Sequence, residues 1–169
     1  MGKASVKRNK NIYQTTREEL GLSREAASEL LETLAPERIE RIENEKILPN
    51  PDDILAMAKG YKAPHICNHY CSNECPIGQQ YVPEIKIKDL SQIVLEMLAS
   101  LNSMKKSQEK LIEITADGKI DDEELADFVF IQKELERISV TVETLRIWAE
   151  QMIADGKIDM DKYNQLKNK

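Results

Sequence analysis

The chain has 169 residues, which is enough for one domain or two small ones with a buried core. Aromatic residues make up 5% of it and charged residues 32%, a balance that favours helices packed by Leu, Ile and Met over a sheet-rich fold. No apolar run is long enough to cross a membrane, so we expect a cytoplasmic chain without membrane contact. Residues 1–64 carry 11 Lys/Arg and 11 Asp/Glu, so the formal net charge of −6 belongs entirely to residues 65–169.

Residues 1–11 are predicted to form a flexible basic arm. Lys7 and Arg8 are among its cations, and no acid stands within the first ten residues. Such an arm can follow DNA phosphates or reach into a minor groove, which makes these two residues candidate DNA contacts. The alternative is a solvated chain start with disordered charge.

Residues 12–64 are predicted to form four short amphipathic helices, at 12–20, 23–31, 36–44 and 52–59. Gly21 suits the left-handed end of the first helix, and Ser23 suits the N-cap of the second. Pro36 and Pro51 suit the first turns of the third and fourth helices, because the amide donor that proline lacks would be unpaired there.

This ordered set resembles the helix-turn-helix domain of the Cro/repressor (XRE) family of DNA-binding regulators, which has a lambda-repressor-like fold. The resemblance covers about a third of the chain, and the matching residues are Arg17, Gly21-Leu22-Ser23, Ala27, Ile39, Ile42-Glu43-Asn44, Pro49 and Ile54 to Ala58. It implies that the third helix enters the major groove and that Arg17 and Glu43 form a structural ion pair. It also places Arg24 and Lys46 where the family touches phosphates, with simple surface solvation as the alternative for both.

The third helix offers its outward side chains as candidate base contacts. Arg38 or Arg41 can donate to guanine, and Asn44 can pair with adenine or a phosphate. Glu37 or Glu40 can accept from the amino group of cytosine. The alternative is a solvated face on which the arginines only neutralise neighbouring acids four residues away.

All three cysteines and both histidines lie within residues 65–75, at the start of a joining segment at 65–88. This density of thiols and imidazoles suits zinc or an iron-sulfur cluster, and the candidate metal ligands are His65, Cys67, His69, Cys71 and Cys75. Cys-x3-Cys-x3-Cys is a familiar spacing of neither site, and on one helix the outer thiols would be roughly 12 Å apart. A packed cluster of reduced cysteines and a redox-sensing thiol pair are the alternatives.

Residues 77–88 contain Gly78 and Pro83 without a helical period, and we predict an extended linker or an arm that lies on a neighbour. Residues 89–169 are predicted to form a long helical hairpin, with one helix reaching about residue 115, a second reaching Ala154 and at most a short helix after that. Apolar side chains at alternating steps of three and four define the predicted contact stripe: Leu90, Val94, Met97, Leu101, Met104 and Leu111, then Leu125, Phe128, Gln132, Leu135, Val142, Ala149 and Ile153. Helices this long leave an apolar face that needs a partner, so we expect a homodimer through residues 89–155.

The sequence Ala-Asp-Gly-Lys-Ile-Asp occurs at 116–121 and again at 154–159. The first copy overlaps the ligand spacing of an EF-hand calcium loop, but the second has Gln151, Ile153 and Lys162 at ligand positions. We therefore interpret both copies as turns in which glycine ends one helix and aspartate caps the next.

The sequence contains no Gly-rich phosphate loop and no spacing that suggests a nucleophile with its base, so we expect no enzymatic activity. It predicts an all-α protein, with an N-terminal helix-turn-helix domain followed by a long C-terminal helical hairpin. The implied function is a sequence-specific, dimeric repressor of transcription whose partner is double-stranded DNA. A protein-interaction adaptor on the same scaffold and a metal- or redox-responsive regulator are the alternatives.

Overall fold

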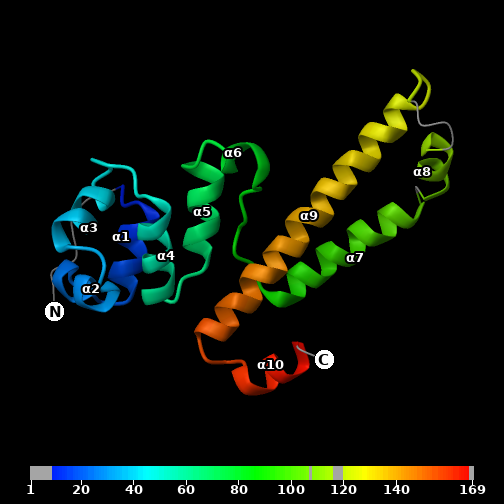
Figure 1. Ribbon diagram of the computed structural model, residues 1–169. Helices are drawn as coiled ribbons and strands as arrows, with labels where there is room; N and C mark the ends of the chain where they lie inside the picture. Colours follow the sequence, from blue (N-terminus) through cyan, green and yellow to red (C-terminus); the bar gives the residue numbers. More distant parts are fainter. Residues whose placement is uncertain (1–8, 107, 116–119, 168–169) are drawn as a thin grey trace. The chain divides into compact units, whose positions relative to one another are not determined.

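The structure is a computed structural model that describes residues 9–106, 108–115 and 120–167. Every regular element in these residues is a helix, so the predicted all-α fold is confirmed. The chain divides into two compact units (Figure 1), one of residues Met1–Glu84 with Glu150–Lys169 and one of residues Ile85–Ala149.

The first unit is built largely from the helices that precede residue 84. In chain order these are α1 (Ile12–Glu19), α2 (Arg24–Leu31), α3 (Pro36–Glu43), α4 (Pro51–Gly60), α5 (His65–Asn73) and α6 (Gly78–Tyr81). The end of α9 (Leu125–Ala154) and the helix α10 (Met160–Lys167) belong to the same unit.

The predicted helix punctuation is present in the first four helices. Gly21 has a positive φ of 69° after the end of α1, and the Ser23 side chain accepts from the amide of Ala26 at 3.1 Å to cap α2. Pro36 and Pro51 occupy the first turns of α3 and α4. The residues that predicted the four helices therefore also mark the end of α1 and the beginnings of α2, α3 and α4.

Apolar side chains from α1 to α5 form one continuous core. Its buried members are Tyr13, Ala27, Leu31, Leu34, Ile39, Ile42, Ile54, Met57, Ala58, Tyr61, Ala63 and Ile66. This core fixes α3 against its neighbours, so the outward side of α3 is determined by which of its residues are buried.

The joining segment is more regular than the sequence predicts. Residues His65–Asn73 form α5, and the first part of the predicted extended linker folds into the short helix α6. A side chain at Gly78 would place its Cβ 2.0 Å from the backbone oxygen of Cys71, so glycine allows α6 to lie directly against α5. Four residues are too few to show a helical period, which explains why the prediction of an extended segment is wrong here.

The second unit contains α7 (Leu90–Lys106), α8 (Gln108–Thr115) and most of α9 (Leu125–Ala154). Helices α7 and α9 run antiparallel, which gives the predicted hairpin (Figure 1). The predicted first arm is covered to residue 115 by α7 and α8, with residue 107 outside the described residues, and the second arm ends at Ala154 as predicted.

The buried faces of α7 and α9 differ from the predicted contact stripe. Ser100 of α7 and Glu134, Thr141 and Thr144 of α9 are buried together with Ile93, although four of these five residues are polar. The two threonine hydroxyls donate to carbonyls four residues back in α9, so these buried polar groups are satisfied within their own helix.

Much of the predicted stripe is instead exposed on the second unit. Its partly buried members are Met97, Met104, Leu111, Phe128, Ala149 and Ile153, and its exposed members are Leu90, Val94, Leu101, Leu125, Gln132, Leu135 and Val142. Apolar residues thus cover more of each helix surface than the contact within the hairpin buries. Much of the predicted stripe lies on the part of that apolar surface that stays exposed.

The second copy of the repeated hexapeptide forms the predicted turn. Gly156 has a φ of 70° after the end of α9, and Asp159 accepts from the amides of Asp161 and Lys162 at the start of α10. In the first copy, residues 116–119 lie outside the described residues, and Asp121 accepts from two amides that follow it.

Candidate nucleic-acid interface

A buried ionic network joins the first three helices. Arg17 of α1 donates from Nε to Glu43 Oε1 at 2.5 Å and from Nη2 to Oε2 at 2.9 Å, and its Nη1 donates to the backbone oxygen of Leu22. Arg24 of α2 donates from Nε to Glu43 Oε2 at 2.9 Å. The hydrogen bond to Glu43 raises the pKa of Arg17. The structure thus brings together the two residues of the implied ion pair and adds a second guanidinium to the same carboxylate.

Arg24 keeps part of its side chain open to solvent. The side chain is 29% exposed, whereas that of Glu43 is fully buried. A guanidinium carries five N–H donors, and the bond to Glu43 uses one of them. A phosphate contact by Arg24 is therefore compatible with its place in the network.

Helix α3 turns its apolar side inward and its charged side outward. Ile39 and Ile42 are fully buried in the core. Glu37, Glu40 and Arg41 are exposed, as the predicted recognition face requires. Side chains at these positions on one helix can enter a major groove together without disturbing the core.

Arg41 and Lys46 are exposed cations at the end of α3. Within the described part of the chain, neither forms an ion pair with a neighbouring carboxylate, so the alternative of mutual neutralisation is not observed for Arg41 there. Asn44, the C-cap of α3, lies half-buried between them. The full charge of Arg41 and Lys46 is therefore available to DNA phosphates or bases.

Arg38 has a different environment because it reaches the start of α4. Its Nε donates to Asp53 Oδ1 at 2.8 Å and its Nη2 to Oδ2 at 2.5 Å. Burial by itself would raise the pKa of Asp53, but the hydrogen bonds from Arg38 and from the amide of Asn50 outweigh burial and lower it. Arg38 is thus held in one orientation, with its side chain 39% exposed.

The surface around α3 carries many carboxylates. Exposed acids on α2, α3 and the turn that follows α3 are Glu25, Glu29, Glu37, Glu40 and Glu45. Carboxylates oppose the approach of phosphates, so this surface is poorly suited to non-specific attraction of DNA.

Two of the candidate contacts cannot be placed. Lys7 and Arg8 lie outside the described residues, as does most of the predicted basic arm. Lys10, a described cation of the arm, binds Glu18 of α1 at 2.5 Å.

The candidate metal ligands are distributed along α5 and the turn after it. Among the described residues, no group of three or more His, Cys, Asp or Glu side chains is arranged to hold a metal ion. Burial raises the pKa of Cys71, with a smaller contribution from Cys75, whereas reactive thiols need a lowered pKa. The three cysteines are half-buried, in an environment that suits packing.

His69 of α5 packs on α1 beside a hydrogen bond between Tyr13 and Glu74. The Tyr13 hydroxyl donates to Glu74 Oε1 at 2.7 Å, and burial followed by this bond raises the pKa of Tyr13. The ring of His69 lies edge-on to that of Tyr13, with centroids 6.1 Å apart. Burial lowers the pKa of His65, which favours its neutral form.

Asp53 is a residue of this interface that the sequence analysis missed. Its side chain accepts from the amide of Asn50 while the Asn50 side chain accepts from the amide of Asp53, which forms a capping box at the start of α4. The spacing Asn-x-x-Asp beside Pro51 could have revealed the capping box, but its contact with Arg38 depends on how α3 and α4 pack.

Comparison with known proteins gives one match. Residues 14–65 match the family described as Helix-turn-helix. No match was found among curated proteins or among solved structures. None of the helices among the described residues is long and apolar enough to cross a membrane. The matched residues span α1 to α4, so the N-terminal part of this chain is a helix-turn-helix domain of the XRE family of DNA-binding transcription regulators.

Proposed function

We propose that the chain is a sequence-specific repressor of transcription that binds a two-fold symmetric operator as a homodimer. The observation that carries this proposal is the outward face of α3, which is held by the buried Arg17–Glu43–Arg24 network inside a helix-turn-helix match. A dimer presents two such helices to half-sites about one DNA turn apart, roughly 34 Å. Occupancy of a promoter by this dimer blocks transcription without any further activity.

Salt-dependent DNA binding tests the first part of this proposal. The purified chain should bind DNA at about 50 mM salt and lose affinity steeply by about 200 mM, because each neutralised phosphate releases counterions. Arg41→Gln should weaken binding, whereas Lys59→Gln, at an exposed position near the end of α4, should not. Absence of DNA binding at low salt would overturn the proposal and leave the adaptor function.

The positions of the exposed apolar residues in the second unit support the proposed dimer. On both α7 and α9, these residues stand one position after buried residues along the chain. Val94 and Leu101 of α7 each follow a buried residue directly, and so do Leu135 and Val142 of α9. One residue turns a helix by about 100°. Because α7 and α9 are antiparallel and face each other, equal turns bring both exposed stripes to the same side of the hairpin (Figure 1).

This shared apolar side matches what a four-helix dimer requires. Leu135 and Val142 are 51% and 53% exposed, while polar side chains such as Glu134 and Thr141 are buried within the protomer. An apolar face of two long helices is unfavourable in water, and a second copy of the same hairpin has a face of matching length and composition. Two hairpins packed through these faces give a four-helix arrangement.

Light scattering during size-exclusion chromatography tests the dimer. The unmodified chain should have twice the protomer mass, and Leu135→Glu should reduce that mass to one protomer. Lys133→Glu is the matched control, because it also changes charge on exposed α9 but lies two residues away, on the opposite side of the helix. A monomeric unmodified chain, or a dimer that survives Leu135→Glu, would refute this interface.

A further inference from the structure

Arg38 and Asp53 form a rigid pair between the first turns of α3 and α4. Two hydrogen bonds of 2.8 and 2.5 Å join the guanidinium to the carboxylate. The carboxylate is itself fixed by the capping box with Asn50, in which both bonds are 2.8 Å long. Asp53 is buried, so this end of the pair has little freedom to move.

The Asp53 carboxylate binds only one of the two hydrogen-bonding edges of the Arg38 guanidinium that can hold two acceptors. Asp53 accepts from Nε and Nη2, which form the lateral edge, and within the described residues no acceptor contacts Nη1. The terminal edge, which carries one N–H on Nη1 and one on Nη2, therefore remains unbonded. These two parallel donors match the O6 and N7 acceptors that guanine presents in the major groove.

We propose that Arg38 reads a guanine through its terminal edge and that Asp53 is the positioning residue that presents it. This inference rests on the proposed function, since it requires α3 to lie in the major groove. Fixing a long side chain costs rotamer entropy, and the pair with Asp53 incurs much of that cost before DNA arrives. Arg38 is thus the base reader, whereas the unpaired Arg41 retains its rotamer freedom.

The charge of the pair also suits this role. Arg38 neutralises Asp53, so a carboxylate can stand at the DNA-facing start of α4 with little repulsion of phosphates. The pair as a whole adds almost nothing to non-specific attraction. Its contribution is directional and should therefore be visible in sequence preference much more than in overall affinity.

Selection of bound sequences from random DNA tests the inference in the full chain. The unmodified protein should select a site with a guanine in each half-site that Arg38→Gln no longer prefers. Discrimination at that position should fall on the order of 10- to 100-fold, while the other positions stay unchanged. Arg41→Gln is the matched control and should leave the preference for this guanine intact.

Asp53→Asn separates positioning from contact. Asparagine can still accept from the amide of Asn50, so α4 keeps its cap, but the charged partner of Arg38 is lost. This variant should lower discrimination at the same guanine, with no loss of affinity for random DNA at low salt. A purely structural pair would instead lower thermal stability and leave base preference unchanged in both variants, and that result would overturn the inference. A protein that selects no sequence at all would refute the proposed function itself.

Discussion

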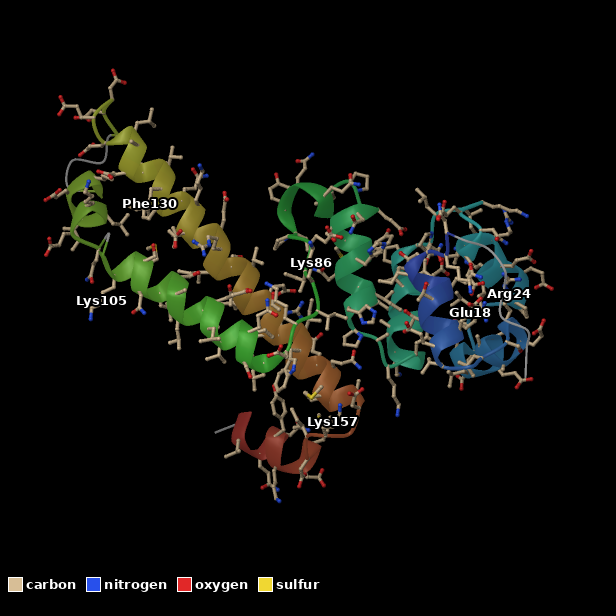
Figure 2. All side chains as sticks on the ribbon, turned by 180° about the vertical axis from the view of Figure 1, so that it is seen from behind. Glu18, Arg24, Lys86, Lys105, Phe130 and Lys157 are labelled. Atoms are coloured by element: carbon tan, nitrogen blue, oxygen red, sulfur yellow. The ribbon has the colours of Figure 1, made fainter. Side chains whose placement is uncertain are left out.

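Glu43→Gln removes one negative charge from the buried network and is predicted to destabilise the first unit strongly. Glutamine keeps the volume of the side chain but offers no charge to Arg17, whose side chain is 7% exposed, or to Arg24. Figure 2 shows Arg24 together with the other side chains of α1 to α3. The perturbation therefore removes the two-bond counter-charge of a buried guanidinium and leaves it only the more distant carboxylate of Glu18, at 3.8 Å.

The expected loss is large relative to the stability of a small domain. Breaking a buried ion pair by removing one partner costs about 3–5 kcal/mol, and domains of this class have about 5–15 kcal/mol in total. Arg24→Gln removes the more exposed partner and leaves Arg17 paired, so its expected cost is about 1 kcal/mol. The double variant Arg17→Met with Glu43→Leu should recover much of the loss, because the guanidinium that then lacks Glu43 is that of Arg24, which is partly open to water.

Hydrogen exchange with urea titration can localise this loss. Amides of α1 and α3 report the opening of the first unit, and Trp148, the only tryptophan, reports the second unit by fluorescence. The free energy of unfolding falls by about 1–3 kcal/mol for each molar of urea, so the urea concentration at the unfolding midpoint of the first unit should fall by at least about 1 M. The fluorescence transition should not move. A loss for Glu43→Gln no greater than that for Arg24→Gln would refute the reasoning.

Three further predictions concern packing, pH and salt. Gly78→Ala should displace α6 and speed the reaction of Cys71 with a thiol reagent, whereas Gly21→Ala, whose Cβ meets nothing within 4 Å, should not. Because burial lowers the pKa of His65, the unfolded chain binds this proton more readily, and stability should fall as pH drops below about 6.5 in urea titrations. Residues 1–8 carry three cations. Their removal should reduce the slope of the logarithm of the DNA-binding constant against the logarithm of salt concentration by up to about 2.7 per protomer.

Each of these predictions has an outcome that contradicts it. Equal thiol reactivity in both glycine variants would mean that α6 does not depend on the close approach at residue 78. A His65→Gln variant with the same pH dependence as the unmodified chain would assign the acid sensitivity to other groups. An unchanged salt slope after truncation would show that the arm makes no phosphate contacts.

The sequence predicts the first four helices well because their boundaries are local. Ser23, Pro36 and Pro51 act through amides within one turn of themselves, so their effect is readable without the fold. The face that the hairpin buries is not local, since it depends on which half of a wide apolar arc meets the other helix. Ser100 and Thr141 lie in that contact although their polarity predicts exposure.

The same distinction applies to the candidate site. The outward position of Glu37 and Arg41 follows from the period of α3 and agrees with the structure. That Arg24 joins Glu43, and that Arg38 joins Asp53, depends on pairs 19 and 15 residues apart on different helices. Spacing within one helix carries no information on such contacts, so the sequence treats Arg38 and Arg41 as equivalent and the structure does not.

The distribution of paired charge explains how a neutral domain can serve as a DNA reader. Arg17, Arg24 and Arg38 each bind a carboxylate, so they add little to the sequence-independent attraction that dominates non-specific binding. Weak non-specific binding raises the ratio of specific to non-specific affinity, which decides occupancy among the many competing sites of a genome. The remaining affinity must then come from linking two helix-turn-helix domains that each bind weakly, because linked sites bind with a high effective concentration. The proposed dimer through the exposed stripes of α7 and α9 would provide that linkage without adding positive charge to the domain.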